Sequence, residues 1–127
     1  MGIEWKESYK IGHAGIDAQH QRLFELINAL TVASDLPSLR KALMQLYRHT
    51  REHFELEEAL MRKVNFPDTL AHTNAHNCLL TKLNALSQDV GQGNVDKLAI
   101  DQLLADWALG HVVKDDAKIA AFIGKLA

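Results

Sequence analysis

The chain has 127 residues, of which 47% are hydrophobic and 24% are charged, and this composition excludes wholesale disorder. Its formal net charge of -2 leaves no basic excess for holding a phosphate backbone, so nucleic acid is not an expected partner. Its one cysteine cannot form an internal disulfide, its first residues lack the apolar segment of a signal peptide, and no apolar run is long enough to span a bilayer, so we expect a cytoplasmic protein without membrane contact.

The predicted elements follow from where glycine and proline interrupt the chain. An N-terminal arm is expected over residues 1–15, and four long segments follow it in which apolar residues recur at steps of three and four. These segments predict helices over about residues 16–35, 37–64, 69–91 and 96–125. The strict alternation typical of strands is missing from the sequence. The chain is therefore expected to form one all-α domain, residues 1–127, folded as an up-down-up-down four-helix bundle with an N-terminal arm.

Each predicted helix carries polar side chains on its apolar stripe. In chain order these are His20, then His53 and Glu57, then His72 and His76, and finally His111. One such histidine is most often a satisfied core residue. Six polar residues on four stripes are different, because each buried polar group costs roughly 1–3 kcal/mol unless it is paired. They must satisfy one another or share a bound partner.

A metal is the partner that this set of side chains favours. His53 and Glu57 are four residues apart, so they project from one helix face, and His72 and His76 repeat that spacing. Imidazole combined with carboxylate suits iron, zinc, copper or nickel. Five histidines are too many for one tetrahedral zinc, whereas two ions that share carboxylates fit the number of ligands.

The identity of a seventh ligand stays open on spacing. Asp115 lies four residues after His111 and Asp116 lies five after it. In an α-helix a step of five turns the side chain by roughly 140°, which favours Asp115. Apolar residues later in the helix continue a stripe from either aspartate, so periodicity does not choose between Asp115 and Asp116.

Two other metal motifs compete with this interpretation. The segment from His49 to His53 matches the H-x-x-E-H pattern of some metallopeptidases, with Glu52 as the base. That motif leaves the polar residues of the third and fourth helices unexplained. Ferritin-like di-iron proteins use Glu-x-x-His pairs, and this sequence contains none.

Several segments in order resemble the single-domain bacterial hemerythrins. They are Ile16-Asp17-Ala18-Gln19-His20, His53-Phe54-Glu55-Leu56-Glu57-Glu58, His72 with His76, and Trp107-Ala108-Leu109-Gly110-His111 with Asp116. The family pattern has a carboxylate five residues after the last histidine, so the resemblance selects Asp116. It implies a non-haem di-iron centre in which His72, His76 and His111 bind one iron and His20 and His53 bind the other. Glu57, Asp116 and an oxo or hydroxo group would bridge the two iron ions.

The resemblance also implies a function, which is reversible binding of dioxygen for carriage, storage or delivery, without catalysis. The alternatives are an oxygen or redox sensor that acts on an unidentified partner protein, and iron buffering or handling of nitric oxide or peroxide at the same centre. Trp107, one turn before His111, is expected to form a wall of the metal pocket.

Four residues outside the ligand set carry weaker expectations. His49 stands where the family usually has tyrosine, and we expect either a partly exposed helix residue or a hydrogen-bond partner beside the ligands. His13 is expected at the surface, Cys78 as a packed thiol, and Asp115 facing solvent beside Lys114 or Lys118.

Overall fold

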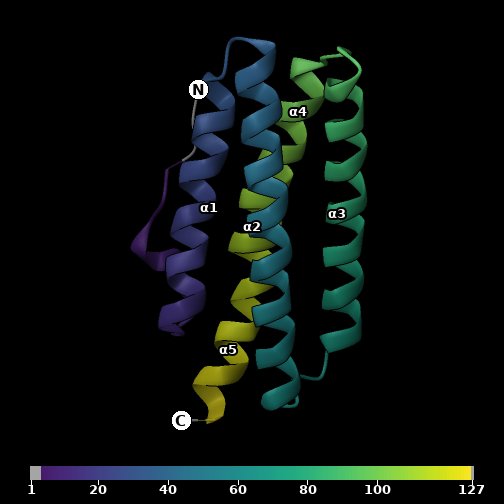
Figure 1. Cartoon of the computed structure of the whole chain (residues 1–127). Helices are drawn as coiled ribbons and strands as arrows, with labels where there is room; N and C mark the ends of the chain where they lie inside the picture. Colours follow the sequence, from purple (N-terminus) through teal and green to yellow (C-terminus); the bar gives the residue numbers. More distant parts are fainter. Residues whose placement is uncertain (1–3, 127) are drawn as a thin grey trace.

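The computed structural model describes residues 4–126, except for the side chains of Leu109 and Leu126. A 3-10 turn, η1 (Glu7–Tyr9), precedes the long helices α1 (Ala14–Val32), α2 (Leu36–Lys63) and α3 (Thr69–Gly91). A fourth rod follows, made of α4 (Lys97–Ala105), the π-helical segment η2 (Asp106–Asp115) and α5 (Asp116–Leu126). Figure 1 shows the rods running alternately up and down. No strand occurs between residues 4 and 126, so the predicted all-α bundle is confirmed.

The starts of α1, α2 and α4 are fixed by side chains that accept backbone hydrogen bonds. Asp35 accepts from the backbone of Ser38 at the start of α2, and Asp96 does the same for Ala99 at the start of α4. At the start of α1 the acceptor is Nδ1 of His13, 3.1 Å from the backbone nitrogen of Ile16. His13 is therefore a half-buried helix cap, a role that the expectation of a surface residue did not include.

The N-terminal arm, described from residue 4 onward, packs along α1. Its chain turns at Gly12, where φ is +90°, a conformation that glycine adopts without strain. Just before that turn the backbone nitrogen of Ile11 donates to Oδ1 of Asp17 at 2.7 Å, and both residues are buried. Trp5 meets Phe24 of α1 edge to face, with ring centroids 5.3 Å apart. These contacts hold the arm against the first helix.

The fourth rod is helical throughout but changes its period. The residues at the junctions, Ala105, Asp106 and Asp116, keep right-handed helical dihedral angles. The backbone nitrogen of Asp116 donates to the carbonyl of His111, five residues earlier, as in a π-helix. The single helix that was expected over 96–125 is thus an α-helix with a wider π-helical middle.

Two apolar clusters fill the interior and a polar layer separates them. The larger cluster contains Leu23, Phe54, Leu83 and Ala108, one residue from each rod. The smaller one consists of Ile11, Ile16, Met61, Phe66 and Ile119. Along α1, α2 and the fourth rod the metal-ligand candidates lie between a member of one cluster and a member of the other, and on α3 they lie between Phe66, in the loop before the helix, and Leu83. The fold therefore surrounds these polar side chains with hydrocarbon on both sides.

Within residues 4–126, none of the helices combines the length and the hydropathy that a bilayer crossing requires.

Candidate metal centre

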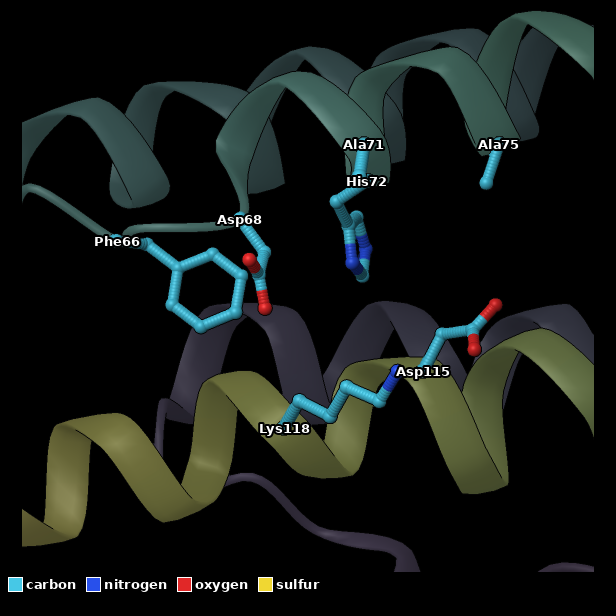
Figure 2. Close-up of a pocket in the computed structure, with 7 residues that line it drawn as sticks. All are labelled: Phe66, Asp68, Ala71, His72, Ala75, Asp115 and Lys118. Atoms are coloured by element: carbon cyan, nitrogen blue, oxygen red, sulfur yellow. The ribbon is translucent and has the colours of Figure 1, made fainter.

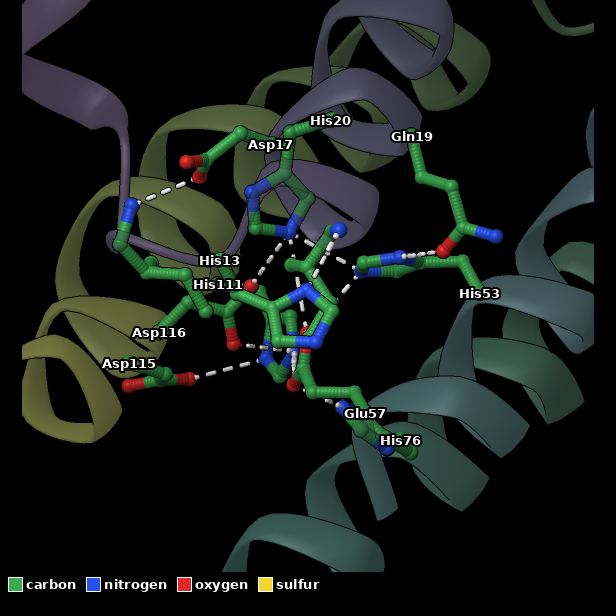
Figure 3. A network of polar contacts seen from close by, with 12 residues as sticks. His13, Asp17, Gln19, His20, His53, Glu57, His76, His111, Asp115 and Asp116 are labelled. Carbon is green, nitrogen blue, oxygen red and sulfur yellow. Dashed lines mark hydrogen bonds and ion pairs between the residues drawn. The ribbon is translucent and has the colours of Figure 1, made fainter. Parts of the chain in front are cut away.

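Seven polar side chains from the four rods meet in the layer between the apolar clusters, and Figure 3 labels all of them except His72. All are buried, with exposed fractions of 0% to 6%: His20, His53, Glu57, His72, His76, His111 and Asp116. They are the seven residues that sequence analysis nominated. Five imidazoles and two carboxylates at such burial require either protons or cations among them.

The ligand atoms form two groups that overlap in their carboxylates. In the first group Glu57 and Asp116 join His72, His76 and His111, and in the second they join His20 and His53. Within each group the candidate ligand atoms all lie within 4.8 Å of one another. Each group contains nitrogen and oxygen ligands in a set that could hold a transition-metal ion.

Each carboxylate directs one oxygen to each group. Oε1 of Glu57 is 3.0 Å from Nε2 of His76, whereas Oε2 is 3.0 Å from Nε2 of His53. Oδ1 of Asp116 is 2.9 Å from Nε2 of His72, whereas Oδ2 is 3.0 Å from Nε2 of His20. This division of oxygens is the arrangement of carboxylates that bridge two ions.

The π-helical segment places the two adjacent aspartates differently, Asp116 inside the bundle and Asp115 toward its surface. Its wider turn brings residues five apart to nearly the same face, so Asp116 points inward with His111. Asp116 is fully buried, and its Oδ1 lies 3.3 Å from Nε2 of His111. Asp115 lies on the outer side of His111, with Oδ2 3.2 Å from Nδ1 and a side chain that is 42% exposed. Asp115 therefore contacts a histidine, which the expectation of a purely solvent-facing side chain missed.

Several inner atoms are close together without being matched as hydrogen bonds, although Nε2 of His72 and Nε2 of His76 both hydrogen-bond to Oε1 of Glu57. Within the described part of the chain, Nε2 of His111, Oε2 of Glu57 and both carboxylate oxygens of Asp116 are buried and have no hydrogen-bond partner of acceptable geometry. Histidine Nε2 atoms and carboxylate oxygens lie about 3 Å apart, and they point toward shared positions between the side chains. Buried polar groups are rarely left without a hydrogen-bond partner, and a cation at each of these shared positions would satisfy them. The donor set therefore fits a pair of metal ions.

Protons supply positive charge to the layer in the metal-free protein. Burial disfavours a charged imidazole at His20, yet its close contacts with the negative carboxylates of Asp116 and Glu57 raise the pKa of His20 to about 9. Burial likewise opposes charge at His72, and close contacts with the same two carboxylates raise its pKa to about 9. Metal ions would displace such protons, because a coordinating imidazole must be neutral.

The pKa values of Glu57 and His111 are shifted toward the protonation states that metal ligands need. Burial would raise the pKa of Glu57, but close contacts with four histidine rings hold that pKa well below its usual range. Burial lowers the pKa of His111, an effect that the nearby carboxylates do not offset. The carboxylate is thus ionised and this imidazole neutral, as ligands must be.

The outward ring nitrogens of three histidines are held by residues that the sequence analysis did not single out as hydrogen-bond partners. Nδ1 of His53 lies 2.8 Å from Oε1 of Gln19, and Nδ1 of His76 lies 2.9 Å from Oε2 of Glu58. Asp115 holds His111 in the same way. Such bonds fix which nitrogen of each ring faces inward. Glu58 and Gln19 are sequence neighbours of inward-pointing residues, which is the one signal that could have indicated them.

His49 supports α1 and does not join the cluster. Its Nε2 donates to the backbone carbonyl of Gln19 at 2.9 Å, and its ring lies parallel to that of His53. Glu52 is exposed, so the residues of the H-x-x-E-H pattern do not converge on one place. The metallopeptidase alternative therefore has no geometric support.

Aromatic rings wall the layer on the side of the larger cluster. Phe54 stacks on His76 with ring centroids 3.6 Å apart and planes 5° apart. Trp107 lies beside His111 at 5.5 Å, as expected for a wall of the pocket. Cys78 is exposed and belongs to neither ligand group, so its expected packing was wrong.

Comparisons with known proteins agree with this geometry. The family model described as Hemerythrin HHE cation binding domain matches residues 12–123. A Hemerythrin-like protein of Naegleria gruberi is 32% identical over 91% of this chain and 89% of its own length. A Bacteriohemerythrin of Stenotrophomonas maltophilia is 29% identical over 93% of this chain and 79% of its own length. The crystal structure of a hemerythrin point mutant superposes with a TM-score of 0.84 at 24% identity, covering 96% of this chain and 98% of that one, which shows a shared fold.

Proposed function

The chain belongs to the hemerythrin family, and from that premise we propose that it binds dioxygen reversibly at a non-haem di-iron centre in the polar layer. Family membership supports iron and dioxygen as the metal and the ligand. The two overlapping groups of ligand atoms support a pair of ions.

In this proposal His72, His76 and His111 hold one iron, and His20 and His53 hold the other. Glu57 and Asp116 would each be shared between the two ions, and an oxo or hydroxo group would complete the proposed centre. The observation that carries the assignment is the division of each carboxylate between the two histidine groups. When bound, the irons supply the electrons and the coordination position that dioxygen needs. The group with two histidines has one imidazole fewer, so it is the group that leaves a position for the ligand.

The side chains around the layer orient the ligands and exclude water. Gln19, Glu58 and Asp115 hold three imidazoles from outside, so each ring keeps Nε2 directed inward. Phe54 and Trp107 are 2% and 1% exposed and cover the layer from the side of the larger cluster. By excluding water, these rings would keep protons away from a bound ligand, which favours reversible binding.

Metal analysis and an optical spectrum test this proposal together. Metal-replete protein is expected to contain close to two irons per chain. The anaerobically reduced protein should gain an absorption band in air and lose it when dioxygen is removed. One zinc per chain, with no chromophore that depends on iron, would contradict the di-iron assignment.

The rate of autoxidation separates the physiological alternatives. Slow autoxidation over many cycles of oxygenation supports carriage, storage or delivery. Fast autoxidation supports a redox sensor, and repeated turnover with peroxide or nitric oxide supports an enzyme-like role.

A further inference from the structure

A cavity opens from the surface directly onto one of the candidate ligands. It has a volume of about 160 Å³ and lies between α3 and the junction of η2 with α5. Figure 2 shows the ring of His72 directed into the space between these elements, with Asp68 to one side and Asp115 to the other. His72 is 6% exposed, the largest exposed fraction among the seven residues of the polar layer. The cavity therefore leads from solvent to the group of three histidines.

A second hollow on the same face reaches another histidine of that group. It has a volume of about 400 Å³, and its lining includes His111, Asp106 and Lys114. Both hollows are lined by Ala75 and Asp115, so they adjoin along the line where α3 faces η2. We call this line the α3–η2 seam. Two hollows along α2, lined by Met44 and Tyr47, contain none of the seven residues.

Small side chains keep the seam open where larger ones would close it. Ala71 and Ala75 line it from α3, and Gly110 lines it from η2. Elsewhere the facing positions of the bundle carry leucine, isoleucine and phenylalanine, which fill the space between the rods. The gap at the seam thus follows from side-chain size at three positions.

The charges at the seam suit a cation that passes inward. Asp68 stands at the mouth, and Asp115 lies farther in with its carboxylate against His111. Lys118 and Lys114 line the same hollows, so the carboxylates attract a divalent ion while the lysines oppose it. A carboxylate that contacts a ligand histidine from the solvent side offers a cation an intermediate place to bind.

We propose that the α3–η2 seam is the route by which Fe(II) enters and leaves the polar layer, with Asp115 as the transit ligand and His72 and His111 as the first histidines reached. The inference rests on the proposed di-iron function. Entry exchanges water ligands of the ion for imidazole and carboxylate, and the protons displaced from the histidines pass to solvent.

Filling the seam tests the route. Ala75→Leu places a larger side chain where the two hollows meet, and Ala85→Leu adds the same bulk at an exposed position of α3 outside both hollows. Fe(II) is added to each metal-free variant without oxygen, and protein-bound iron is measured against time. Removal is followed with a coloured Fe(II) chelator.

Ala75→Leu is expected to slow both loading and removal by about tenfold or more, because the ion then has to wait for the rods to separate. Its final iron content should match that of the unaltered protein, and Ala85→Leu should load at the unaltered rate. Equal rates for the two variants would overturn the proposal and would indicate entry by general opening of the bundle.

Charge variants test the same route without adding bulk, should Ala75→Leu fail to fold. Asp68→Asn is expected to slow Fe(II) loading a few-fold at low salt, and Lys118→Gln is expected to accelerate it. Both effects should shrink at high salt, where mobile ions screen surface charges. Glu25→Gln on α1, an exposed position away from the seam, serves as the control. Rates that follow none of these charges would refute the route.

The outcomes for the route and for the function are separable. An unaltered chain that takes up no iron at equilibrium refutes the proposed function. A chain that reaches two irons at rates independent of the seam retains the function and refutes the route.

Discussion

Glu57 is the residue on which the two histidine groups depend together. Its Oε1 faces His76 and His72, its Oε2 faces His53, and the side chain is fully buried. Asp116 repeats this role from the opposite rod with one oxygen for each group. A change at either carboxylate therefore affects both ligand groups, whereas a change at one histidine affects mainly its own.

At the scale of single residues, the adjacent Asp115 and Asp116 provide a matched comparison. Asp116→Asn removes a buried charge that the two proposed iron ions would require, so we expect the variant to hold fewer than two irons per chain after desalting. Asp115→Asn is isosteric and leaves an amide oxygen to face His111, so it should keep both irons. Iron analysis of both purified variants makes the test. Iron loss from Asp115→Asn that equals the loss from Asp116→Asn would contradict the inward placement of Asp116.

At the scale of the elements, the accuracy of sequence-based prediction depended on helix period. His53 with Glu57, and His72 with His76, lie in regular α-helix, where a step of four returns to the same face, so spacing alone grouped them. His111 and Asp116 share a face because η2 has the wider π-helical turn, which a fixed α-helical step does not anticipate. Only the family resemblance selected Asp116.

The periodicity of apolar residues also could not predict hydrogen bonds made by residues that lie outside the apolar stripes. Gln19 and Glu58 lie beside the apolar stripe and not on it, and their position next to His20 and Glu57 is the one sign in the sequence of the histidines that they contact. The capping role of His13 was missed because histidine is an uncommon helix cap. Such contacts depend on the packing of one helix against another, or on one ring orientation.

The cap at the start of α1 leads to a prediction for His13. His13→Ala removes the acceptor for the backbone nitrogen of Ile16 and should lower the free energy of unfolding by about 1 kcal/mol. His13→Asn keeps an acceptor and should recover most of that loss. Denaturant unfolding of the iron-loaded variants measures both. Equal stability of His13→Ala and the unaltered protein would show that the cap contributes nothing.

At the scale of the whole molecule, the bundle has a polar layer where a continuous core would be expected. Apolar clusters on both sides position five imidazoles and two carboxylates, but they do not neutralise them. The interior is therefore stable only with cations or protons in the layer. Global stability and occupancy of the layer are linked.

Removal of the metal is therefore expected to lower the melting temperature markedly. Binding to the native state alone stabilises by about 4 kcal/mol when the free metal is at a thousand times its dissociation constant. Differential scanning calorimetry of iron-loaded and chelator-treated protein provides the comparison. Identical melting temperatures would mean that the layer does not bind metal in solution.

The metal-free protein should also become less stable as the pH rises from about 6.5 to 9. The folded-state pKa values of His20 and His72 are raised from 6.5 to about 9, so their contribution is complete below pH 6.5 and is lost as the pH passes through 9. Below the usual glutamate range the trend reverses, because the lowered pKa of Glu57 favours the folded state only while its carboxylate is ionised. Thermal melts from pH 4 to 10 test this, and a flat profile above pH 6.5 would contradict it.

The two tryptophans give the molecule an intrinsic optical reporter. The chain has only these two, and their rings lie next to candidate ligands. The ring centroids of Trp5 and His20 are 6.5 Å apart, and those of Trp107 and His111 are 5.5 Å apart. Indole fluorescence is quenched by a transition-metal ion at such short range. Because no tryptophan lies elsewhere in the sequence, unquenched background emission should be small. The emission intensity of the unlabelled protein should then report the fraction of chains whose centre is filled.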